Sequence, residues 1–225
     1  MGWAHRVAQG MVPAPDQALR QSQDVLSWSL RKNGPHSPIS IKAMVEVANQ
    51  LAVQNRPTEE VVLREQIVSG LRTQPGPEHE TTLSAELKLA TCLTALERAE
   101  EAEPLLAHVV EVRTGDLGRG DPLTLTAMAW SATVAKKLGK LGDARALQEE
   151  IVSAYDEQGA GESDQALVAA LNLASTLTEI HDLEGASRLL RHVLDVRQRT
   201  LGADDPKTRD VLRVLASIGA DGAGG

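Results

Sequence analysis

The sequence predicts an all-α fold, a right-handed α-solenoid of antiparallel helix pairs with about ten helices. Three observations lead to this prediction: a pattern that repeats every 42 residues, two helical segments in each repeat, and a composition that favours helices. Aromatic residues make up 2% of the 225 residues and Phe is absent. Such a chain lacks the aromatic bulk that the core of a compact β-sandwich or barrel usually needs.

The repeat is most visible in a turn that precedes a helix. The segment from Leu117 to Thr124 resembles the segment from Leu201 to Thr208, with an offset of 201 − 117 = 84, and related turns lie at half this offset. The repeats therefore start near residues 34, 76, 118, 160 and 202. Three columns of small or β-branched residues keep the same phase: Ala48, Ala90, Ala132, Ala174 and Ala216; Ala18, Ala102, Ala144 and Ala186, with Glu60 as the exception; and Val25, Ile67, Val109, Ile151 and Val193.

Each repeat contains two predicted helices. The first begins at a residue that favours the helix N-cap, and Pro often follows at the position where a missing N–H costs nothing. These starts are Ser37, His79, Asp121, Ser163 and Asp205, and the second helices start near residues 57, 99, 141 and 183. Residues 15–32 fit the register of a second helix, and residues 205–218 form a last, more polar first helix, as an end cap requires.

These boundaries predict one solenoid over residues 15–219. Residues 1–14 form an N-terminal segment, for which a degenerate helix is one interpretation, and the Gly/Ala-rich residues 220–225 are predicted to be a disordered tail.

Composition excludes several classes of function. A net charge of −8 disfavours nucleic acid as a partner, because phosphate binding needs a basic face. We find no apolar run approaching the roughly 18 residues of a membrane span, and no signal peptide. The single cysteine, Cys92, suits a reducing compartment and is interpreted as a small core residue rather than a nucleophile. We therefore expect a cytoplasmic protein that is no enzyme and needs no metal or cofactor, since no catalytic, phosphate-binding or metal-ligating motif is present.

Specific residues connect the repeat to a known family. The segments Ala170-Leu171-Asn172-Leu173-Ala174, Glu101 to Leu106 and Leu-Gly-x-Asp-Asp-Pro-x-Thr at residues 201–208 closely resemble the kinesin-light-chain type of tetratricopeptide repeat. The resemblance covers roughly residues 15–219. It implies a superhelix whose first helices line a concave groove while its second helices form the convex back.

The resemblance also implies which side chains face the groove. They are the residues before the Leu and after the Ala of each Leu-Ala pair, together with two positions one turn further on. The resulting candidate binding residues are Glu46, Asn49, Lys88, Thr91, Trp130, Thr133, Lys137, Asn172, Ser175 and Glu179. Asn before the Leu-Ala pair, which the family favours, occurs here only as Asn172, so we expect individual ligand contacts.

Trp130 differs most from its counterparts in the other repeats, which are Glu46, Lys88, Asn172 and Val214. One interpretation is that Trp130 anchors an apolar side chain of a ligand, as aromatic hot-spot residues do. The other is that Trp130 packs against a neighbouring helix. The sequence leaves both interpretations open.

Two functional hypotheses follow. The first is a binding scaffold or adaptor that holds a protein or peptide partner in the groove, with Lys88 and Lys137 favouring an acidic segment. The second is a sensor module that binds a small molecule or signalling peptide and regulates a separate effector. The unpaired end helices also offer a surface for stacking on another copy of the chain.

Overall fold

The computed structural model describes residues 15–222, which form ten helices and no strand. The predicted second helices are α2 (Pro15–Asn33), α4 (Pro57–Thr73), α6 (Ala99–Leu117), α8 (Leu141–Glu157) and α10 (Leu183–Leu201). The first helices are α3 (Pro38–Val53), α5 (Glu80–Ala95), α7 (Pro122–Lys137), α9 (Asp164–Glu179) and α11 (Pro206–Gly222). Within each series the spacing between successive helix starts is constant (57 − 15 = 42), as predicted. This arrangement confirms the all-α fold of helix pairs.

The helix starts are held by local hydrogen bonds. The side chain of Ser37 accepts a hydrogen bond from the main-chain N–H of Ser40 at 3.1 Å, and Asp121 accepts one from Leu123 at 2.8 Å. These bonds satisfy N–H groups that the first turn of a helix leaves without a partner. The N-cap positions that the sequence predicts are therefore those that the structure uses.

A second feature of the turns also recurs at the spacing of the repeat. Between the first and second helix of a repeat, one residue adopts a positive φ angle, at Asn55 (54°), Glu97 (59°), Gly139 (73°) and His181 (63°). Only one of the four is a glycine, although this region of φ is costly for a side chain that carries a Cβ. The backbone of the repeat therefore imposes the turn whatever residue occupies it.

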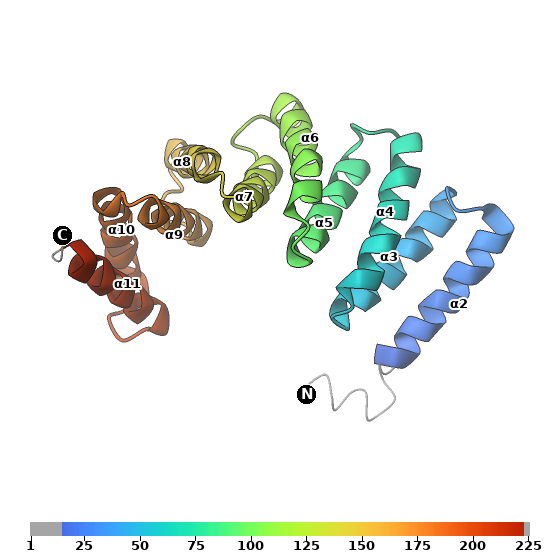
Figure 1. The fold of residues 1–225 in the computed structure, drawn as a ribbon, viewed down its shortest axis with the longest axis horizontal. Helices are drawn as coiled ribbons and strands as arrows, with labels where there is room; N and C mark the ends of the chain where they lie inside the picture. Colours follow the sequence, from blue (N-terminus) through green and yellow to red (C-terminus); the bar gives the residue numbers. More distant parts are fainter. Residues whose placement is uncertain (1–14, 223–225) are drawn as a thin grey trace. The chain divides into compact units, whose positions relative to one another are not determined.

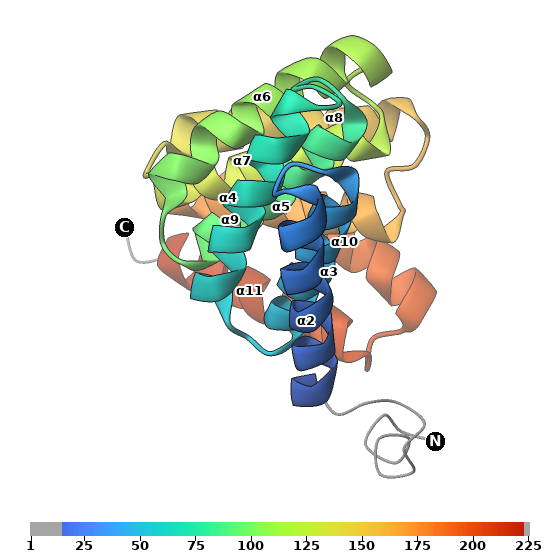
Figure 2. The ribbon, with the colours of Figure 1, turned by 90° about the vertical axis from the view of Figure 1, so that its right-hand side faces the viewer.

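The chain divides into two units, residues 1–105 and 106–225, and the boundary falls inside α6. In the N-terminal unit α2 packs on α3, α3 on α4 and α4 on α5 (Figures 1 and 2). In the C-terminal unit α7, α8, α9, α10 and α11 pack in the same consecutive manner (Figure 1). Each unit has its own apolar core, centred on Met44, Val47 and Ile67 in the first and on Leu173, Leu190 and Val193 in the second.

The alanine column allows the helices to approach closely. Ala48, Ala90, Ala132 and Ala174 are almost completely buried, whereas Ala216 on the last helix is exposed. The β-branched column behaves alike, since Ile67, Val109, Ile151 and Val193 are buried while Val25 is 58% exposed. Among residues 15–222 no helix precedes α2, so nothing described there covers Val25.

The ends of the chain differ in part from the predicted boundaries. α11 extends through Gly222, so it includes the first three residues of the segment predicted to be a tail. The rest of that segment and the N-terminal segment of residues 1–14 lie outside the described residues. None of the helices from α2 to α11 combines the length and the apolar character that crossing a membrane requires.

Candidate functional site

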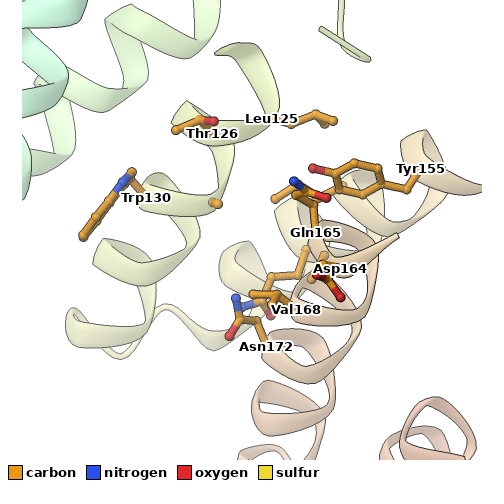
Figure 3. Close-up of a pocket in the computed structure, with 12 residues that line it drawn as sticks. Leu125, Thr126, Trp130, Tyr155, Asp164, Gln165, Val168 and Asn172 are labelled. Atoms are coloured by element: carbon orange, nitrogen blue, oxygen red, sulfur yellow. The ribbon is translucent and has the colours of Figure 1, made fainter. Parts of the chain in front are cut away.

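The C-terminal unit has a hollow of about 340 Å³ between α7, α8 and α9. Its apolar lining comes from Leu125, Ala129, Ile151, Val168 and Ala169, and its two aromatic side chains are Trp130 and Tyr155. Figure 3 shows Trp130 on α7 at one side of the hollow, and Val168 and Asn172 on α9 at the other. The polar lining consists of Thr126, Gln148, Asp164, Gln165 and Asn172.

Gln148 is the most unusual residue of this hollow. It comes from α8 and is 5% exposed, and its Oε1 atom has no hydrogen-bond partner among the described residues. A buried acceptor without a donor costs about 1–3 kcal/mol, and native structures contain few of them. Gln148 therefore lines the hollow with an amide whose acceptor is used by no donor among the described residues.

The N-terminal unit has a corresponding hollow of about 570 Å³ between α3, α4 and α5. Of the twelve residues that line the first hollow, all except Trp130 have a counterpart two repeats earlier that lines the second. Ile41 corresponds to Leu125, since 125 − 41 = 84, and Arg64 corresponds to Gln148. The two hollows are thus one structural site, present in both units.

The two hollows differ in charge. The hollow of the N-terminal unit is lined by Lys42, Arg64, Glu80 and Lys88. Arg64 is buried, and its Nε donates a hydrogen bond of 2.6 Å to Oε1 of Glu60. In the hollow of the C-terminal unit, Asp164 is the one charged residue of the described lining. The same backbone therefore presents three cationic residues and one carboxylate in one unit, and acceptors with aromatic rings in the other.

Neighbouring repeats differ from those that form the hollows by an arginine, which is buried at Arg113 and half-buried at Arg197. Arg113 on α6 is 1% exposed, and its Nη1 donates a hydrogen bond of 3.1 Å to the main-chain oxygen of Leu123 in the first turn of α7. Arg197 on α10 makes the same bond, at 3.0 Å, to Lys207 in the first turn of α11. At this repeat position the hollows have Leu71 and Tyr155 instead.

The structure brings three of the sequence-predicted site residues to the hollows. Trp130, which is 36% exposed, and Asn172 line the hollow of the C-terminal unit, and Lys88 lines that of the N-terminal unit. Trp130 thus contributes to a concave surface and keeps a solvent-accessible face. This position is compatible with ligand contact.

The other predicted residues of the C-terminal unit lie on α7 and α9. Ser175 and Glu179 are joined through Lys136, a residue that the sequence did not single out. The Nζ of Lys136 donates a hydrogen bond of 3.1 Å to Ser175 Oγ and lies 2.8 Å from Glu179 Oε1. Thr133 donates a hydrogen bond to Ala129 O of its own helix, and Lys137 is exposed.

In the N-terminal unit, Glu46 is exposed and accepts a hydrogen bond of 3.0 Å from Gln50 Nε2. Thr91 donates a hydrogen bond to the main-chain oxygen of Lys88, and Asn49 is half-buried on α3. None of these three residues lines the hollow of this unit. Only part of the expected polar strip therefore lines the two hollows.

Sequence reasoning missed the lining that the second helices provide. Gln148 occupies a column that contains Leu106 and Leu190, both buried, and Tyr155 occupies the column of Arg113 and Arg197. A polar residue in a buried leucine column is a signal that the sequence carries. The expected arrangement, in which second helices form the convex back, did not include these residues in the site.

Cys92 lies apart from both hollows and is buried on α5, as predicted. Its Sγ lies 3.5 Å from the main-chain oxygen of Pro57. Burial, followed by the nearby carboxylate of Glu60, raises the pKa of the Cys92 thiol to about 11. Within residues 15–222 no group of three His, Cys, Asp or Glu side chains is arranged to hold a metal ion.

Comparison with known families gives two matches, both to models described as tetratricopeptide repeat. One covers residues 79–157 and the other residues 167–207. Together they cover 79 + 41 = 120 of the 225 residues, which is more than half of the chain. No curated protein matches the sequence significantly.

Several solved structures are similar in fold. Nearly identical TPR-like repeats of a putative kinesin light chain from Podosopora anserina match with a TM-score of 0.77 and 22% identity, over 88% of this chain and 93% of that one. BtubC (BKLC) from P. vanneervenii matches with a TM-score of 0.71 and 14% identity, over 92% and 84%. MamA from Desulfovibrio magneticus RS-1 matches with a TM-score of 0.55 and 12% identity, over 84% and 99%.

Proposed function

The chain belongs to the tetratricopeptide repeat family, and from this premise we propose that it is a non-catalytic scaffold that holds a segment of a partner protein in the hollow between α7, α8 and α9. The observation that carries the proposal is the composition of this hollow. An apolar lining is combined there with the solvent-accessible Trp130 and with an acceptor, Gln148 Oε1, that has no partner among the described residues.

The apolar lining supplies affinity. Each Å² of apolar surface that a partner side chain removes from water stabilises the complex by about 25 cal/mol, before the entropy lost on association is subtracted. Aromatic residues in well-packed pockets often contribute most of the binding free energy of an interface. Trp130 therefore serves as the anchor of the site.

Polar groups at the rim supply orientation. The amide of Asn172 contains both donors and an acceptor, so it can pair with an extended main chain in either direction. Thr126 and Gln165 are exposed on the two helices that flank the hollow. An extended peptide segment, with its repeating N–H and C=O groups, suits such a rim better than a compact metabolite does.

Lys42 and Lys88 support a different preference in the N-terminal unit. Both are exposed lysines beside an apolar lining, and a carboxylate of the partner would be attracted to them. This extends the expectation that Lys88 favours an acidic segment, while Lys137 lies outside both hollows.

The test is a selection of random displayed peptides against the full chain, followed by affinity measurements on variants. We expect Trp130→Ala to weaken the selected peptides at least about ten-fold, as hot-spot truncations do. Trp28→Ala is the matched control, because Trp28 is 51% exposed and lies on α2 in the other unit, where its ring faces Lys32.

Equal binding of the selected peptides to the Trp130→Ala variant would remove this hollow as the site. The sensor hypothesis predicts another pattern. Under that hypothesis a metabolite pool would raise the Tm of the chain while displayed peptides yield no binder. Saturable peptide binding that depends on Trp130 supports the scaffold.

A further inference from the structure

One position of the repeat holds an arginine guanidinium in two of its copies. In two repeats of the C-terminal unit, a side chain from the second helix reaches the first turn of the following helix, where Arg113 donates to Leu123 O and Arg197 donates to Lys207 O. Arg113 is buried, so the space beneath this first turn accommodates a guanidinium away from water. The carbonyl oxygen has a second lone pair that is free to accept although the first belongs to the helix.

The repeat between these two has no arginine of its own at this place. Tyr155 stands where the others have Arg113 and Arg197, and the first-turn residue that corresponds to Leu123 is Gln165. Gln148 replaces the buried leucines Leu106 and Leu190. No lysine or arginine belongs to the described lining of this hollow.

The hollow consequently collects acceptors. They are the unpartnered Oε1 of Gln148 and the carboxylate of Asp164, and the first-turn residue Gln165 also lines the hollow. The terminal amide bond of glutamine has a broad torsional preference, so Oε1 can turn toward a donor in the hollow. Tyr155 adds an aromatic ring on the α8 side, on which a guanidinium can stack, and Trp130 lies at the opposite side of the hollow (Figure 3).

We propose that this hollow binds an arginine side chain of the partner segment. The guanidinium donates hydrogen bonds to Gln148 Oε1 and to the carboxylate of Asp164, and the aliphatic stem packs on Ile151 and the ring of Tyr155. The inference rests on the proposed function, since it names the side chain that the scaffold selects there. The chain's net charge of −8 attracts such a cationic segment from solution.

Arginine fits this set of groups better than other side chains. An apolar side chain would cover Gln148 Oε1 without supplying a donor, which leaves the cost of the buried acceptor in place. A lysine ammonium carries three donors at one point, whereas the planar guanidinium carries five donors that reach acceptors on several sides. A carboxylate would face Asp164 and find no cation in the described lining.

The test uses the full chain, labelled with nitrogen-15, and the indole N–H signal of Trp130 in NMR spectra, which is assigned by its loss in Trp130→Phe. The probes are four capped tripeptides, acetyl-Ala-X-Ala-amide, with Arg, Lys, Leu or Glu at the centre. We expect the Arg peptide to shift the signal saturably with a Kd about ten-fold below those of the Lys and Leu peptides.

The decisive variant is Gln148→Leu, because leucine is the residue of the equivalent buried positions 106 and 190 and preserves the packing. It should weaken the Arg peptide about ten-fold while the urea midpoint of unfolding stays the same or rises. Trp28→Ala, in the other unit and outside both hollows, is the control and should leave binding of the Arg peptide unchanged.

Two results would overturn the inference: a Leu peptide that binds as tightly as the Arg peptide, or undiminished Arg binding to Gln148→Leu. These results differ from failure of the proposed function. If a Leu peptide binds as tightly as the Arg peptide and the displayed peptides still need Trp130, the scaffold function stands and the preference for arginine is wrong. If the displayed peptides bind the Trp130→Ala variant as tightly as the unmodified chain, this hollow is not the binding site.

Discussion

The guanidinium of Arg113 donates a hydrogen bond of 3.1 Å to the main-chain oxygen of Leu123, and the same bond joins Arg197 to Lys207 two repeats later. Each bond links a second helix to the first turn of the next helix. Because Arg113 is 1% exposed, its charge depends on such partners.

Arg113→Met should lower the free energy of unfolding by about 2–3 kcal/mol, since a hydrogen bond to a charged group contributes about 1.5–3 kcal/mol. Urea denaturation followed by circular dichroism measures this loss. Arg197→Met is the control. Arg197 is only half-buried, so its replacement should cost about 1 kcal/mol. Equal losses in the two variants would show that burial does not set the strength of the bond.

The pair formed by Glu60 and Arg64 should respond differently to single and double substitution. Glu60→Ala leaves the buried Arg64 without its partner and should destabilise the chain by about 3 kcal/mol. The double variant Glu60→Ala/Arg64→Leu copies the Ala102 and Leu106 pair of the next repeat, and its urea midpoint should return to that of the unmodified chain or exceed it.

A double variant as unstable as Glu60→Ala would mean that the ion pair is needed for the fold itself. Arg64→Leu alone provides the remaining corner of the cycle. It leaves Glu60 buried without its cation and should also destabilise the chain.

The positive-φ turn predicts opposite effects of glycine and alanine. Gly139 has a φ angle of 73°, and a Cβ added there would meet no atom within 4 Å, so Gly139→Ala should cost about 1 kcal/mol through backbone conformation alone. His181 occupies the equivalent position with a φ angle of 63°, and His181→Gly should stabilise the chain by about 0.5 kcal/mol. Thermal unfolding of both variants checks the signs. Shifts in the same direction would contradict this explanation.

The Cys92 thiol should resist alkylation in the folded chain. Burial and the carboxylate of Glu60 raise its pKa from 9.0 to about 11, so the thiolate fraction at pH 8 falls about a hundred-fold relative to the unfolded chain. Iodoacetamide should therefore react at least that much more slowly with the native chain than with the chain in urea. Similar rates would show that the environment of Cys92 opens readily.

Local sequence signals determined most of the fold. The starts of the helices follow from N-cap side chains and from prolines at the first helical position, which act only on their immediate neighbours in the chain. The alanine columns at Ala48, Ala90, Ala132 and Ala174 were recognisable because close packing between helices needs a small residue in each repeat. These signals recur in successive repeats, so each copy reinforces the interpretation of the others.

The candidate site depended on side chains from three helices of two successive repeats, and only the tertiary structure brought these together. Trp130 could be singled out from the sequence because it departs from its column. Its neighbours Gln148 and Tyr155 could not be assigned to the same hollow, since that requires knowing which face of α8 lies beneath α7 and α9. Whether a buried acceptor has a donor is likewise a property of packing, and the unpartnered oxygen of Gln148 became visible only there.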